Sequence, residues 1–421
     1  MFETLVGRVP DEWCTTTLGE LCASGGGDIQ TGPFGSQLHA SDYVPVGIPS
    51  VMPQNIGDNV LLEDGIARIT QDDANRLSRY LLKPGDIVYS RRGDVERRAW
   101  IRAEQSGWLC GTGCLRARVG KSADSRFVSY YLGHPNVRAW IVQHAIGATM
   151  PNLNTGILGS VPVVMPTKYV QVAIAELLSS LDDKIAINGR IAETSRKLSI
   201  SVGQRLFTDA AGETVTLGNC ADIVKGLSYR SSDLGSGTYG LVSLKCVGRD
   251  GDFRPIGIKP YHGEYKATQA VGDGDIVVAQ TDLTQRAEVI GRPVRVLNHG
   301  GFTKLIASLD LVIVRPYPPL SREALLALLS TEEFREHALS YCNGTTVVHL
   351  SSKALPEFKF NMPQPDAMQS TTVKMTPLLG RADQAKRENQ NLIELRDTLL
   401  PKLMSGEIRV RDAEKVVEDV T

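Results

Sequence analysis

The sequence has no long apolar run, few cysteines and no excess of either charge. None of its 421 residues belongs to a stretch approaching the roughly 20 apolar residues that span a bilayer. Its N-terminus, MFETLVGRVPDEW, lacks a cationic stretch followed by an apolar one, so we expect no secretory signal and predict a cytoplasmic protein with no membrane partner. The 46 Lys and Arg residues balance 47 Asp and Glu residues, which gives no overall basic signal for nucleic acid.

Seven cysteines are too few for a disulfide framework, and their odd number also argues against one. We therefore expect reduced thiols. Cys110 and Cys114 form the one close pair, but no second pair stands at metal-ligand spacing, so a packed strand is the simpler interpretation.

Catalytic motifs are also missing. The sequence has no Gly-x-Gly-x-x-Gly at a strand-to-helix turn, no phosphate-binding Gly-x-x-x-x-Gly-Lys-[Ser/Thr] and no His-Glu-x-x-His. Asp86 and Asp275 stand at matched places, but each follows Gly, where a turn-forming Asp is a sufficient explanation. We predict a non-enzymatic chain with neither catalytic residues nor a metal or cofactor of its own.

The sequence does contain an internal repeat at about half its length. TTLGELCAS at 16–24 is echoed by VTLGNCADI at 215–223, KPGDIVYSRRG at 83–93 by GDGDIVVAQTD at 272–282, and IGATMPNLN at 146–154 by NGTTVVHLS at 343–351. Short β-like runs bounded by turn residues open each copy. A helical segment follows, at about 127–144, where Gly133 to Asn136 should break it, and at about 322–341.

Each copy ends in a long helical pattern, at 168–207 and at 371–404. Apolar residues recur there mostly at spacings of three or four, a narrow stripe that is typical of a coiled coil. A polar residue interrupts both stripes and can fix the register. Two unrelated helices, each packed on its own domain, are the alternative. The seam and subunit-interface residues that we predict are Leu177, Leu181, Ile185, Asn188, Ile191, Leu198, Asn389, Leu392, Leu395, Leu399 and Leu403.

The sequence thus predicts an α+β protein: two similar mixed α/β domains separated by two long helices that form an antiparallel coiled coil, related by a pseudo-twofold axis. The predicted boundaries are 1–166 for the first domain, 167–212 for the central helix, 213–365 for the second domain, 366–406 for the distal helix and 407–421 for a C-terminal tail.

Charge is unevenly distributed along this repeat. Eight basic and three acidic residues lie between Arg76 and Arg102, and the densest part, 90–98, follows a predicted strand and is expected on a loop. Arginines there could pair with phosphates or reach guanine edges, although a solvated charged loop is an equally good interpretation. The matching loop of the second copy is polar, with Arg286 opposite Arg97, which suggests two readers of different sequences.

Polar turns after Gly147 and Gly344 form a second matched pair, for which capping of the adjoining helix is the alternative. The residues that we predict to contact DNA are Arg91, Arg92, Arg97, Arg98, Thr149, Asn152, Asn154, Lys245, Arg249, Thr281, Gln285, Arg286, Thr345, Thr346 and His349.

Several strings, taken with this architecture, resemble the specificity subunit of type I restriction-modification enzymes. The segments 177–198 and 388–410 are similar to that family's central and distal conserved helices, and GPFGSQL, GIPSVMPQNI and GATMPNLN to turns of its target recognition domains. The second copy departs from the first of these strings, reading Lys225-Gly226-Leu227-Ser228-Tyr229.

The resemblance implies that the chain binds double-stranded DNA and selects the site. Each domain would read one half of an asymmetric bipartite site, and the helix pair would set the spacer and dock two methyltransferase subunits. S-adenosylmethionine, ATP and Mg²⁺ would belong to the methyltransferase and restriction subunits. A fused or methyltransferase-only system is the first alternative, and a solitary DNA-modifying enzyme is the second.

Overall fold

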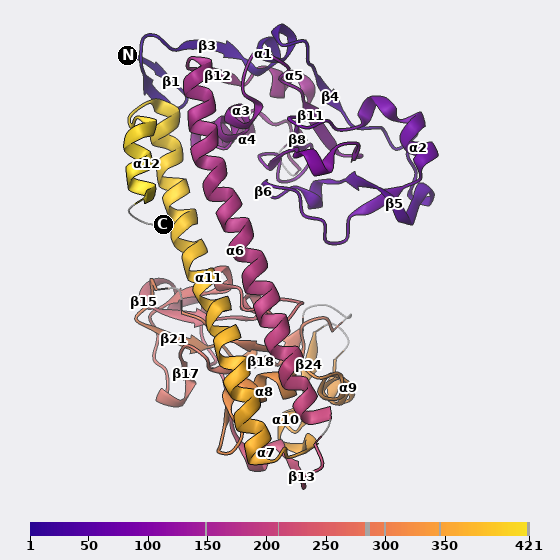
Figure 1. Ribbon diagram of the computed structural model, residues 1–421, viewed down its shortest axis with the longest axis vertical. Coiled ribbons are helices and arrows are strands. Elements are labelled where there is room, and N and C mark those ends of the chain that lie inside the picture. Colours follow the sequence, from indigo (N-terminus) through magenta and orange to yellow (C-terminus); the bar gives the residue numbers. More distant parts are fainter. Residues whose placement is uncertain (148–149, 209, 283–286, 299, 345–346, 419–421) are drawn as a thin grey trace. The chain divides into compact units, whose positions relative to one another are not determined.

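The computed structural model describes residues 1–147, 150–208, 210–282, 287–298, 300–344 and 347–418 (Figure 1). The chain forms two compact units. Unit 1 comprises Met1–Ile185 and Asn391–Thr421, and unit 2 comprises Ala186–Gln390. Two long helices, α6 (Lys168–Thr208) and α11 (Pro365–Ser405), each contribute one part to unit 1 and one part to unit 2.

Unit 1 is built on a five-stranded sheet with a three-stranded sheet and two two-stranded pairs. In the sheet order β4-β11-β8-β9-β6, the strands are Ile29–Thr31, Cys114–Ala117, Ile87–Ser90, Arg98–Trp100 and Asp58–Asn59. The order β10-β5-β7 gives Leu109–Cys110, Tyr43–Val51 and Ala67–Ile69. The two pairs are β1 (Phe2–Thr4) with β2 (Gly7–Val9) and β3 (Cys14–Thr17) with β12 (Pro162–Met165). Its shorter helices are α1 (Leu18–Ser24), α2 (Gln71–Arg76), α3 (Ser125–Leu132), α4 (Pro135–His144), α5 (Thr155–Gly159) and α12 (Val410–Glu418).

Unit 2 has two four-stranded sheets, one three-stranded sheet and one pair. The order β14-β22-β18-β20 gives Ala221–Lys225, Leu311–Pro316, Ile276–Ala279 and Pro293–Arg295. The order β16-β15-β21-β17 gives Lys259–Tyr261, Leu234–Val242, Lys304–Ala307 and Ala270–Val271. The others are β19-β24-β23 (Thr281–Asp282, Val348–Leu350, Cys342–Asn343) and β13 (Thr214–Thr216) with β25 (Lys359–Asn361). Its shorter helices are α7 (Leu217–Cys220), α8 (Arg322–Leu329), α9 (Glu332–Ser340) and α10 (Ala354–Glu357).

Strand order confirms the predicted repeat. In unit 1, β8 lies between β11 and β9, and in unit 2, β18 lies between β22 and β20, all antiparallel. Similarly, β5 pairs antiparallel with β7 and parallel with β10, as β15 does with β16 and β21. Two copies of one β framework therefore follow each other along the chain.

The helical segments differ from expectation in the second copy. The predicted break near Gly133 is confirmed, because α3 ends at Leu132 and α4 begins at Pro135 with His134 as its N-cap. The segment 322–341 was expected to be one helix, but it is also broken: Thr331 caps α9 with its hydroxyl accepting from the Phe334 amide at 3.2 Å. An N-cap residue has a non-helical backbone conformation, so a Thr that caps a new helix also ends the preceding helix, even where no Gly or Pro is present. The predicted tail also contains a helix, α12.

The long helices pack together as antiparallel partners. In unit 1, Leu181 of α6 and Leu399 and Leu403 of α11 are at most 3% exposed and belong to one core. Leu177 and Leu392 are also buried, while Ile185 and Leu395 are partly buried against the same core.

In unit 2 the seam consists of small residues rather than leucines. Ala192, Ala382 and Ala385 form its buried cluster, with Ile191 partly buried beside them. A Cβ on Gly203 would come within 2.4 Å of the Ala327 Cβ, so the backbone of α6 approaches its neighbours closely there.

The prediction that Leu198 lies in the seam is wrong, because its side chain is 50% exposed. Its neighbour Ser199 is fully buried and donates a hydrogen bond from Oγ to the Met375 carbonyl at 3.3 Å. The polar interruption at Asn188 is buried as expected, at 4% exposure, and Asn389 is partly buried.

All seven cysteines are free thiols. Cys110 and Cys114 are buried on neighbouring strands, and burial raises the pKa of the Cys110 thiol to about 12. No helix among the described residues is long and apolar enough to cross a membrane.

Leu181 and Leu198 provide a matched test of the helix seam. We expect Leu181→Asp to lower the free energy of unfolding by about 3–5 kcal/mol, because it places an unpaired charge in a packed core. Leu198→Asp, on an exposed side of the same helix, should change it by about 0.5 kcal/mol or less. Urea unfolding followed by circular dichroism measures both, and equal effects would contradict the seam described above.

His134 makes unit 1 sensitive to acid. Burial lowers the pKa of this imidazole from 6.5 to about 4, and its neutral Nδ1 accepts from the Asn136 amide at 3.1 Å. The unfolded chain therefore binds a proton that the folded chain rejects, and stability should fall as the pH decreases from about 6.5 to about 4. His134→Asn keeps a side-chain acceptor, so the difference in unfolding midpoint between wild type and variant should change over this window. A constant difference would contradict the assignment.

Candidate nucleic-acid interface

In unit 1 the structure joins the basic loop to the polar turn, two segments that are far apart in the sequence. The loop runs from β8 to β9, and the turn follows α4. Arg92 and Ile146 each form a β-bridge with Asn152. The Gly93 amide donates to the Pro151 carbonyl at 3.2 Å, and the Leu153 amide to the Arg91 carbonyl at 2.8 Å. Backbone bonds thus fix both segments as one surface.

Unit 2 makes the same connection at the corresponding positions. Thr281 of β19 pairs with His349 of β24, and Asn343 of β23 pairs with His349 on its other side. When the two copies of the repeat are aligned, Thr281 occupies the position of Arg92, His349 that of Asn152 and Asn343 that of Ile146. The two units therefore present different side chains on one backbone arrangement.

The arginines of the unit 1 loop differ sharply in availability. Arg92 is exposed and Arg91 is partly buried, with its Nε lacking a hydrogen-bond partner. Arg97 is 45% exposed in its side chain and forms an ion pair with Asp94 at 2.6 Å. The loop charge that remains accessible is thus carried mainly by Arg91, Arg92 and Arg97.

Arg98 was expected on this loop, but it is the first residue of β9 and its side chain is only 3% exposed. Its guanidinium pairs with Asp58 at 2.9 Å and donates from Nε to the Ser129 carbonyl at 2.5 Å. Because the guanidinium N–H groups of Arg98 donate to partners within unit 1, a direct contact of Arg98 with DNA is not expected.

The polar candidates also separate into two groups. Asn154 caps α5 by accepting from the Ile157 amide at 2.8 Å, and Thr281 is buried and donates to Asp310 at 2.9 Å. Lys245 and His349 are exposed, and Arg249 is exposed but pairs with Glu288 at 3.0 Å. The capping interpretation thus holds for Asn154.

Asn152 is partly buried, with an Oδ1 that lacks a partner in the described structure. Five further candidates lie outside the described residues: Thr149, Gln285, Arg286, Thr345 and Thr346.

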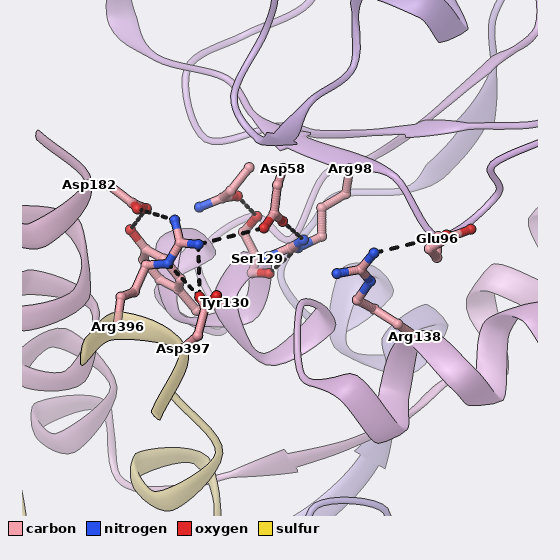
Figure 2. A network of polar contacts seen from close by, with 10 residues as sticks. Asp58, Glu96, Arg98, Ser129, Tyr130, Arg138, Asp182, Arg396 and Asp397 are labelled. Carbon is pink, nitrogen blue, oxygen red and sulfur yellow. Dashed lines mark hydrogen bonds and ion pairs between the residues drawn. The ribbon is translucent and has the colours of Figure 1, made fainter. Parts of the chain in front are cut away.

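Behind the unit 1 loop lies a charged network that the sequence analysis did not identify (Figure 2). Arg396 of α11 pairs with Asp182 of α6 at 2.8 Å and lies 3.8 Å from Asp58. Asp182 also accepts from the Tyr130 hydroxyl at 2.6 Å, and Asp58 is the partner of Arg98. The network thus runs from the two long helices to the strand that ends the basic loop.

The charges in this network are balanced. Burial would raise the pKa of Asp58, but the guanidiniums of Arg98 and then Arg396 lower it below its usual value. Burial likewise would lower the pKa of Arg396, yet Asp182 raises it above its usual range. No short sequence motif marks such a set, because its members come from five separate segments of the chain.

The described residues contain no group of three or more His, Cys, Asp or Glu side chains that could hold a metal ion.

Comparison with known proteins agrees with this architecture. Residues 10–194 match the family described as the type I restriction modification DNA specificity domain. Over these residues the chain resembles the specificity subunits of type I restriction-modification enzymes. The structure of the S subunit from M. genitalium has the same fold, with a TM-score of 0.57 and 17% identity over 94% of this chain and 98% of that one.

Two relatives come from Methanocaldococcus jannaschii. The MjaIX specificity subunit is 19% identical over 97% of this chain and 96% of its own. The MjaVIII specificity subunit is 24% identical over 210 residues, and this match spans about half of each protein (48% and 47%). The resemblance identified from the sequence strings is thus confirmed, and the pairing of loop and turn lies in the specificity domain of unit 1.

Arg92 and Arg98 offer a matched test of this candidate interface. Arg92→Ala should weaken binding to a duplex and reduce the slope of log affinity against log salt by about 0.9, if one phosphate contact is lost. Arg98→Ala should instead lower the free energy of unfolding by about 1–3 kcal/mol, because a buried charged hydrogen bond is lost. Fluorescence anisotropy across a salt series and urea unfolding separate the two, and an unchanged salt slope for Arg92→Ala would make this arginine a solvated charge.

Proposed function

We propose that this chain is the non-catalytic DNA-recognition and scaffold subunit of a type I restriction-modification complex. Its two domains would each read one half of an asymmetric bipartite site in double-stranded DNA. The observation that carries the proposal is the repeated pairing of loop and turn with different side chains, Arg92 and Asn152 in one unit and Thr281 and His349 in the other. Two matching backbone arrangements that carry different side chains are suited to recognising two different DNA half-sites.

The chemistry of the exposed candidates supports two modes of contact. Arg92 offers a planar guanidinium that can bind a phosphate or the O6 and N7 edge of guanine. The unit 2 surface is less cationic, with His349 exposed and Lys245 at a separate 3₁₀ turn. Phosphate contacts would set the register of each domain, and base-edge contacts would select the sequence.

The helix pair would have two tasks in the complex. Helices of 41 residues are about 62 Å long at 1.5 Å per residue, so they can act as a stiff element that sets the spacer between half-sites. Their outer faces carry exposed apolar side chains, among them Tyr169 at 84% and Val373 at 67%. We assign the docking of two methyltransferase subunits to these helices, with restriction subunits joining that assembly.

The reaction chemistry would come from those partners. Methyltransferase subunits would bind S-adenosylmethionine, and restriction subunits would use ATP and Mg²⁺. A methyltransferase-only or fused system would use the same recognition chain. Methylation of DNA by the isolated chain would contradict the non-catalytic assignment and favour a solitary enzyme.

Domain exchange tests the division of the site. Replacing residues 1–166 with the matching region of another specificity subunit should change only one half of the methylated sequence, because the unit 2 reader is untouched. The reciprocal exchange of 213–365 is the matched control and should change only the other half. Methylome sequencing of cells expressing each chimaera with the methyltransferase reads the result, and a change of both halves by either exchange would refute the proposal.

A further inference from the structure

Each unit contains a pocket at a corresponding place in its fold. In unit 1 it lies beside β9, the junction of α3 and α4, and both long helices. In unit 2 it lies beside β20, the junction of α8 and α9, and α6. In unit 1 the pocket has a volume of about 160 Å³ and is lined by the network of Figure 2, including Arg98, Arg138 and Arg396. In unit 2 the volume is about 380 Å³, and Arg196, Arg292 and Arg335 are among its lining residues. The repeat thus allows the two sites to be compared directly.

Sheet register fixes which residues correspond. Ile87 pairs with Trp100 in unit 1, and Ile276 pairs with Arg295 in unit 2. Counting back along these strands makes Pro293 the counterpart of Arg98 and Arg292 the counterpart of Arg97. The prediction that Arg286 corresponds to Arg97 is therefore wrong, because the loop before β20 is longer than the loop before β9. The helix caps His134 and Thr331 place Arg138 opposite Arg335 in the same way.

In unit 1 the three arginines Arg97, Arg98 and Arg138 each have a carboxylate partner. Arg97 pairs with Asp94 at 2.6 Å, Arg138 with Glu96 at 3.9 Å and Arg98 with Asp58 at 2.9 Å. These pairs neutralise the cations, and the Arg98 side chain occupies space beside the helices. The smaller pocket therefore needs no further anion.

Unit 2 has lost both features. Pro293 removes the third guanidinium and leaves space. Arg292 donates from Nε to the Glu288 carbonyl at 2.6 Å, and Arg335 donates to the carbonyls of Ile290 and Ala287. Within the described residues, no carboxylate lies within 4.0 Å of either guanidinium.

The other two cations of the unit 2 pocket have carboxylate partners of their own. Lys197 pairs with Glu193 at 2.6 Å, and Arg196 lies 3.5 Å from Asp252. Asp250 and Glu332 are the carboxylates that line the pocket. Burial, followed by the positive charge of Arg292, lowers the pKa of Arg335, while Cys342, Glu332 and Asp282 act in the opposite direction.

We propose that the unit 2 pocket binds a phosphate-class anion between Arg292 and Arg335. Guanidinium groups offer planar forks of N–H donors that match phosphate oxygens, and an anion between them removes their mutual repulsion. The volume lies within the range of small-ligand pockets and accommodates inorganic phosphate or a mononucleotide. Because Arg335 also holds the carbonyls of Ala287 and Ile290, the anion would stabilise the end of the unit 2 loop.

The test uses the full chain and inorganic phosphate, without DNA or partner subunits. Phosphate should raise the unfolding temperature more than sodium chloride of equal ionic strength, and its ³¹P resonance should broaden. Arg292→Gln should weaken phosphate binding at least tenfold, while Arg138→Gln, at the unit 1 counterpart of Arg335, should leave it unchanged. Arg292→Lys should restore part of the affinity, because it restores the charge without the fork.

The outcomes separate the possible explanations. Equal effects of phosphate and chloride, or equal phosphate binding by Arg292→Gln and wild type, would overturn the proposal. Unfolding curves without phosphate identify a variant that fails to fold, in which case Arg292→Lys carries the comparison. A short duplex that displaces phosphate from the wild type identifies a DNA backbone phosphate as the source, whereas phosphate retained beside bound duplex identifies a free phosphate compound. Neither result depends on the proposed division of the recognition site.

Discussion

Burial of the apolar faces of α6 and α11 is the constraint on which the structure depends. A helix of 41 residues with one apolar face is not stable in water by itself, because most helical stability in proteins comes from tertiary packing. Ile174 and Leu178 of α6 share a core with Leu399 and Leu403 of α11, more than 200 residues later. Unit 1 therefore cannot complete its core until the C-terminal part of α11 has packed against it.

The sequence predicted the long helices and the repeat because both leave regular patterns. Leucine periodicity located the seam correctly where large side chains fill it, as at Leu181 and Leu399. It failed at Leu198, because the seam in unit 2 is formed by Ala192, Ser199 and Gly203, whose small side chains allow close backbone approach. An apolar periodicity cannot detect a contact that depends on the absence of side-chain volume.

The candidate site was predictable as two segments but not as side-chain positions. Glycines at the turns and the repeated sequence strings predicted the loop and the turn in both copies. In the structure, backbone pairing at Arg92 in unit 1 and at Thr281 in unit 2 joins the loop to the turn. Whether an arginine faces solvent depends on a strand boundary one residue away, and boundaries are the least certain part of a sequence prediction. Arg97 lies before that boundary and is exposed, whereas Arg98 lies after it and bonds Asp58.

Duplication with divergence also explains why a chain of nearly neutral charge can hold strongly basic sites. The three central strands keep the same antiparallel order in each unit, and buried positions differ too, since Tyr89 and Ser90 of β8 correspond to Val278 and Ala279 of β18. Pro293 stands where unit 1 has Arg98, and β20 is the edge strand of its sheet, whereas β9 pairs with both β8 and β6. The unit 2 pocket therefore lacks a guanidinium at this position. Because the scaffold tolerates such changes independently in each copy, the two halves of one chain can acquire different ligands without altering the helix pair that joins them.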